Sequence, residues 1–86
     1  MKIVASGDHH FDEHSPRWAE CLRIHRWMAD EVRRRKPDLF LSGGDIYERA
    51  STPVERSAVA EWLTVLAETC PVIIAKGKYE SVEAEY

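Results

Sequence analysis

Cysteine is scarce in this sequence, with 2 cysteines among 86 residues. Cys21 and Cys70 lie far apart and form no Cys-x-x-Cys pair, so they predict neither a zinc knuckle nor a disulfide framework. Buried, reduced thiols are the interpretation we prefer. Long hydrophobic runs are also missing, because the N-terminal apolar stretch turns polar at Ser6, too early for a signal peptide or a membrane span. We therefore expect a cytoplasmic protein.

Charge is nearly balanced, with a formal net charge of -3 at pH 7. This charge gives no whole-molecule attraction to nucleic acid, so any contact with DNA must come from local patches. Hydrophobic residues make up 44% of the chain, a fraction that excludes intrinsic disorder. A chain of 86 residues forms one domain with a single compact core at most.

Three short apolar runs predict strands. Each is bounded by Gly, Pro, Ser or Asp, as in strands that are buried on both faces of a parallel sheet. The runs are Ile3 to Ala5, Leu39 to Leu41 and Val72 to Ala75. Helical periodicity between them predicts an α/β fold, in which two β-α-β units form a three-stranded parallel sheet with two helices. Right-handed crossovers would put both helices on one face, so we expect association through the uncovered face.

Both helical segments carry start signals. The first is predicted to open at Ser15-Pro16 and to run to about Lys36, before Pro37. Its apolar face has three- and four-residue spacings and contains Trp18, Cys21, Leu22, His25, Met28, Ala29 and Val32. The second helix is predicted to open at Thr52, with Glu55 completing a capping box.

Candidate metal ligands follow the first two strands. Loops at the carboxyl ends of parallel strands converge, and chemistry gathers there. Asp8 and His10 stand two residues apart, so in an extended loop they project to the same side and can bind one divalent metal. Asp45 follows two glycines after the second strand, where a carboxylate can bridge two cations. The alternative is that Asp8 and Asp45 cap loops and helices and that His10 is solvated.

The order of the motifs resembles the calcineurin-like metallophosphoesterases. Asp-x-His and Gly-Asp each follow a buried strand, and Gly77 to Glu80 stand where that family has Gly-Asn-His followed by Asp or Glu. The stretches GDHHFDEHS and GGDIYERASTPVERSAVAEWL look most like the SbcD-type DNA-repair exonucleases. The resemblance covers residues 1–80, and it implies that residues 1–86 are the N-terminal portion of a metallophosphoesterase domain, half of its fold.

This resemblance implies a site and partners. Asp8 and His10 would hold a first metal and Asp45 would bridge to a second, in a family that hydrolyses phosphodiesters with a two-metal site. The implied cofactor is a divalent metal, Mn first, with Fe or Zn as alternatives. The resemblance implies DNA and an ATPase subunit as partners. It implies no association with a membrane.

Two residues depart from the family pattern. Lys78 replaces the asparagine that binds the second metal, and its ammonium would repel a cation there. Tyr79 replaces the catalytic histidine, so we assign no catalytic residue. The family also uses later histidines, whereas this sequence has none after His25. We therefore expect one bound ion at most and an inactive isolated chain. The alternative function is a non-catalytic remnant that binds a single metal or a protein; a phosphoacceptor receiver-like domain is a weaker third hypothesis.

The other polar features have structural interpretations. His9 and His14 are expected to form surface or loop hydrogen bonds, with His9 turned away from His10. His25 is expected to be packed and hydrogen-bonded in the core. The run from Arg33 to Lys36 could contact DNA phosphates, but cations in the last turn of a helix also favour its macrodipole.

Overall fold

The structure is a computed structural model that describes residues 1–7, 9–43, 46 and 51–75. These residues form an α/β fold with the elements β1 (Ile3–Ser6), α1 (Trp18–Arg35), β2 (Leu39–Ser42), α2 (Pro53–Ala67) and β3 (Val72–Ile74). The strands form one parallel sheet in the order β1-β2-β3. The predicted pair of β-α-β units is therefore confirmed. Within the described part of the chain, no helix is long and apolar enough to cross a membrane.

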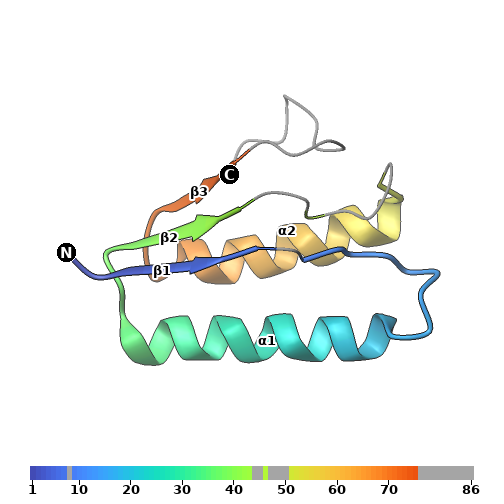
Figure 1. Cartoon of the computed structure of the whole chain (residues 1–86), viewed down its shortest axis with the longest axis horizontal. Coiled ribbons are helices and arrows are strands. Elements are labelled where there is room, and N and C mark those ends of the chain that lie inside the picture. The colour runs from blue at the N-terminus through green and yellow to red at the C-terminus, as the bar shows by residue number, and fades with distance from the viewer. Residues whose placement is uncertain (8, 44–45, 47–50, 76–86) are drawn as a thin grey trace.

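Both helices cover the same face of the sheet (Figure 1). Val4, Phe40 and Val72 are in register across the three strands and pack in the core beneath that face. The ring of Phe40 meets Trp62 of α2 edge to face, with the ring centroids 5.9 Å apart. Phe40 is 1% exposed, so this contact lies in the centre of the two-layer core.

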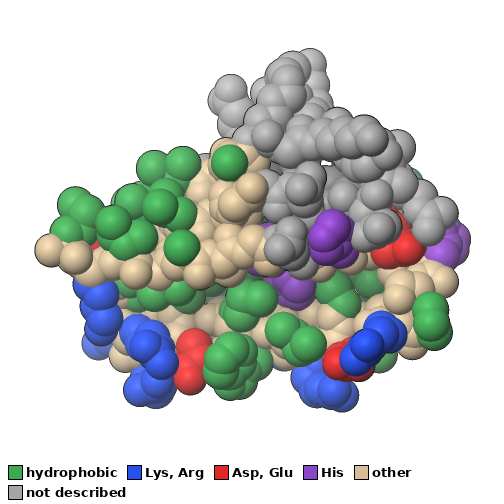
Figure 2. Space-filling view, viewed as in Figure 1, with side chains coloured by type: hydrophobic (Ala, Val, Ile, Leu, Met, Phe, Trp, Pro, Cys, Tyr) green, Lys and Arg blue, Asp and Glu red, His purple; other side chains and the backbone are tan. Residues whose placement is uncertain are grey.

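The other face of the sheet has no cover among the described residues. Ile3 and Ile73 are 48% and 55% exposed, whereas Leu39 and Leu41 between them are half-buried. Figure 2 shows hydrophobic side chains gathered where the strands lie. Among the described residues the prediction of an uncovered face is therefore confirmed, and the expectation of strands buried on both faces is wrong. Val4 lies on the opposite face, where it packs against the core beneath the helices.

The first helix begins later than predicted, at Trp18 instead of Ser15. Ser15 instead opens a turn: its hydroxyl accepts from the Arg17 N–H at 3.1 Å and its carbonyl accepts from the Trp18 N–H. The helix end is close to the prediction, because Lys36 caps it in the left-handed conformation and donates to Val32 O. The predicted apolar face is confirmed, with His25 and its neighbours packed on the core.

The second helix begins as predicted. Thr52 is its N-cap, and the hydroxyl of Thr52 accepts from the Glu55 N–H while the Glu55 carboxylate accepts from the Thr52 N–H. Glu55 also accepts from the Glu13 N–H at 2.9 Å, although Glu13 lies in the loop after β1. This buried carboxylate therefore ties that loop to the start of α2.

Candidate metal centre

The predicted metal ligands are only partly described. Asp8 and Asp45 lie outside the described residues, as do Lys78 and Tyr79. His10 is described, and its side chain is exposed beyond the carboxyl end of β1. The described residues nearest the predicted site are therefore His10 and the residues that flank the two motifs.

The two motif-bearing loops are joined on both sides of the motifs. The Gly43 N–H donates to Ser6 O at 2.7 Å, next to the two strand ends. Further out, the Phe11 N–H donates to Ile46 O, which joins the residue after His10 to the residue after Asp45. The Asp-x-His and Gly-Asp segments are therefore anchored at the same edge of the sheet.

Gly43 lies at one of these contacts. A Cβ on Gly43 would lie 3.4 Å from Ser6 O and 3.6 Å from the Cα of Gly7, which is ordinary van der Waals contact. The backbones of the two loops therefore lie close together at Gly43 and Gly7.

His10 does not lie in an extended loop. Its φ is 49°, in the left-handed region, which costs a residue with a Cβ about 1 kcal/mol or more. The expectation that Asp8 and His10 project to one side of an extended chain is therefore wrong at His10. His9 and Phe11, which flank His10, are 6% and 1% exposed.

A buried histidine pair joins this loop to α1. His9 Nδ1 and His25 Nε2 are 2.8 Å apart, and His9 Nε2 lies 3.2 Å from Ser6 Oγ. His25 Nδ1 lies 2.8 Å from the carbonyl oxygen of Cys21. Burial lowers the pKa of His25, and its hydrogen bond to Cys21 opposes this effect.

The histidine predictions have mixed outcomes. His25 is a packed, hydrogen-bonded core residue, as expected. His9 lies in the loop after β1 and is hydrogen-bonded, as expected, but it is buried and not at the surface. The sequence signal that could have paired the two is that buried His25 needs a hydrogen-bond partner. A separation of 16 residues gives no local pattern that names His9.

The arginines at the end of α1 form exposed ion pairs. Arg34 donates to Glu31 at 2.8 Å, and this contact lowers the pKa of the Glu31 carboxyl. Arg33 lies 3.6 Å from both Asp30 and Glu68. Figure 2 shows basic and acidic side chains along the lower edge of the molecule, where α1 lies. The pairs support a structural role for the basic run.

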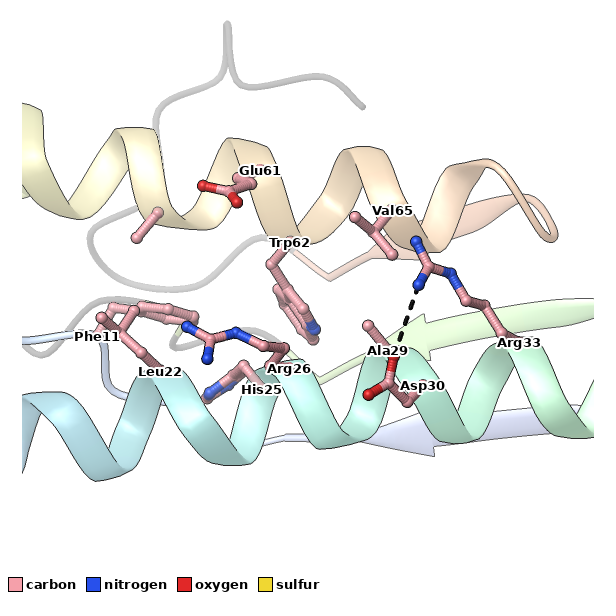
Figure 3. A pocket seen from close by; sticks show the side chains of 11 residues that line it. Phe11, Leu22, His25, Arg26, Ala29, Asp30, Arg33, Glu61, Trp62 and Val65 are labelled. Carbon is pink, nitrogen blue, oxygen red and sulfur yellow. Dashed lines mark ion pairs between the residues drawn. The ribbon is translucent and has the colours of Figure 1, made fainter.

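A pocket of about 210 Å³ lies between α1 and α2, and His10 is not among the residues that line it (Figure 3). Phe11, His25 and Trp62 form its aromatic wall. Its rim carries both charge signs, and Arg33 and Asp30 of that rim pair with each other. The pocket therefore presents no set of metal ligands and no single-sign charge for an ionic substrate.

The predicted donor set suits a divalent cation in its chemistry. Carboxylate and imidazole groups are ligands that Mn, Fe and Zn accept. Among residues 1–7, 9–43, 46 and 51–75, no group of three or more His, Cys, Asp or Glu side chains could hold a metal ion. Burial raises the pKa of the Cys21 thiol, which disfavours the thiolate form that binds metals. A metal centre at this edge therefore needs ligands from outside the described residues, where the predicted ligands Asp8 and Asp45 lie.

The sequence of the chain matches a known protein family. A sequence model described as calcineurin-like phosphoesterase matches residues 1–86, the whole of the chain. No curated protein matched the chain significantly. This chain belongs to the calcineurin-like phosphoesterase family, whose members depend on divalent metal ions.

Proposed function

We propose that this chain carries the first half of the metal site of an SbcD-type phosphodiesterase that acts on DNA in the cytoplasm. The observation that carries the proposal is the hydrogen bond from the Phe11 N–H to Ile46 O. It joins the two segments that contain Asp8, His10 and Asp45. The motifs quoted above support the SbcD branch, and with it an ATPase partner subunit.

In this proposal Asp8 and His10 bind one ion, and Asp45 stands where a second would be bridged. Manganese is the proposed ion, with iron or zinc as alternatives. A divalent ion bound there neutralises phosphate charge and favours ionisation of a bound water. The chain's own contribution is to present the three ligands from two loops that are hydrogen-bonded to each other.

We further propose that the 86-residue chain binds a single ion and turns over DNA at a rate near background. Lys78 places an ammonium where the family binds the second cation, and the two like charges repel. Tyr79 replaces the histidine that assists the reaction. These two residues also favour the second candidate function, a single-metal or protein-binding module without catalysis.

The test is a calorimetric titration with Mn²⁺, followed by a hydrolysis assay on duplex and single-stranded DNA. Wild type should bind one ion, whereas Asp8→Ala and Asp45→Ala should bind it at least about 10-fold more weakly. Asp30→Ala, which removes an exposed carboxylate on α1, is the matched control and should bind like wild type. Absence of Mn²⁺ binding by wild type overturns the proposal, and efficient DNA turnover overturns the single-ion part.

A further inference from the structure

His10 has a left-handed backbone and two buried neighbours. His9 and Phe11 point into the core, while the side chain of His10 is exposed. Phe11 is held by its hydrogen bond to Ile46 O and by contacts with neighbouring rings. The ring of His25 is one of these, with the ring centroids 4.3 Å apart. His9 is held by hydrogen bonds with Ser6 and His25 and by a ring contact with Trp62, with the ring centroids 4.9 Å apart. The orientation of His10 therefore depends on what fixes His9.

The direction of the hydrogen bonds at His9 follows from Cys21. A carbonyl oxygen only accepts, so His25 Nδ1 donates to Cys21 O. In the neutral imidazole of His25 the other nitrogen, Nε2, then carries the lone pair and accepts. The donor to it is His9 Nδ1, at 2.8 Å. A chain of fixed direction thus runs from His9 through His25 into the backbone of α1.

We propose that His25 is a positioning residue for the metal site: it accepts from His9, holds that ring in the core and thereby turns His10 outward toward the cation. The inference rests on the proposed function, because it assigns His10 as a metal ligand. It assigns to His25, which lies on α1 and outside the three motifs, an effect on metal affinity through His9.

Two substitutions separate the two hydrogen bonds of His25. In His25→Gln the amide can place its oxygen where Nε2 stands, so the acceptor for His9 is kept. In His25→Asn the shorter amide can reach only the Nδ1 position, so the donor to Cys21 O is kept and the acceptor for His9 is lost. Both variants remove the same ring from the core, so their difference reports the contact with His9.

The first measurement is Mn²⁺ affinity by calorimetry. Residues that orient a metal ligand typically change metal affinity about 10- to 100-fold when mutated. His25→Asn should therefore weaken Mn²⁺ binding about 10-fold, and His25→Gln should stay within about 3-fold of wild type. Val59→Ala, which trims a core residue of α2 that is 1% exposed, is the control for lost stability and should bind like wild type.

The second measurement is the tautomer of His9 by long-range ¹H–¹⁵N correlation NMR of the metal-free chain. The proton should be found on Nδ1 of His9 and on Nδ1 of His25. A bare Nδ1 on His9 overturns the inference whatever the metal affinities are.

The outcomes are distinguishable. If wild type binds no Mn²⁺, the proposed function fails and the positioning role fails with it. If wild type binds Mn²⁺ and His25→Asn binds it equally well, only the positioning role fails. If Val59→Ala weakens binding as much as His25→Asn, affinity follows global stability, and the positioning role is again overturned.

Discussion

Replacing Glu55 by alanine is expected to cause one of the larger losses of stability in this chain. The Glu55 side chain is 1% exposed and accepts from two backbone N–H groups. These are the N–H of Thr52, at 3.0 Å, and the N–H of Glu13, at 2.9 Å. Glu55→Ala removes both acceptors at once, so the start of α2 loses its capping box and the loop after β1 loses its anchor.

The expected magnitude follows from these two contacts. Hydrogen bonds to a charged group each contribute about 1.5–3 kcal/mol, and loss of an N-cap interaction costs about 1 kcal/mol. Taking the carboxylate out of water offsets part of this gain, so we expect Glu55→Ala to lower the free energy of unfolding by about 2–4 kcal/mol. Glu55→Gln retains one acceptor oxygen and should lose roughly half as much.

Urea denaturation followed by far-UV circular dichroism measures this loss. Glu61→Ala, at an exposed position of the same helix, is the control and should change stability by no more than about 0.5 kcal/mol. The reasoning fails if Glu55→Ala is as stable as Glu61→Ala. It also fails if Glu55→Gln is as destabilised as Glu55→Ala, because the loss would then not follow the acceptor oxygens.

Three further outcomes are expected. Lys36→Gly should stabilise the chain by about 0.5–1 kcal/mol and raise its urea midpoint, because Lys36 caps α1 with a φ of 48°, which glycine adopts more easily. A lower midpoint would contradict this. Burial lowers the pKa of His25, so the free energy of unfolding should be greatest above the unfolded pKa of about 6.5 and should decrease as the pH falls below it. In that acidic range the urea midpoint of His25→Gln should fall less with pH than that of wild type, and an equal fall would refute the assignment. Wild type should pair with a second copy through its open, apolar sheet face, and Ile73→Lys should reduce that association in light scattering; a monomeric wild type would disprove it.

The sequence predicted the parts of this fold that depend on local pattern. The capping box at Thr52 and Glu55 is a motif of four consecutive residues, and the structure has it. The start of α1 was wrong because Ser15 can serve a turn as well as a helix, and local sequence does not separate the two. The shared face of both helices followed from the handedness of the crossovers, which applies whatever the side chains are.

The motifs that suggest the site could be predicted from the sequence, whereas the arrangement of the residues in space could not. The order of Asp8, His10 and Asp45 indicated the family, but nothing local revealed the left-handed backbone of His10. The contact of His9 with His25 depends on how α1 packs under the loop, which is a tertiary effect. Such contacts follow only once the elements have been placed against each other.

The central claim is that the loops after β1 and β2 share one metal ion. Adding Mn²⁺ to the ¹⁵N-labelled chain tests it directly, because the ion broadens the amide resonances that lie close to it. The account predicts that the amides of Gly7, Phe11, Gly43 and Ile46 broaden together, while that of Glu68, at the opposite end of the strands, stays sharp. Broadening confined to one of the two loops, or equally strong at Glu68, would contradict it.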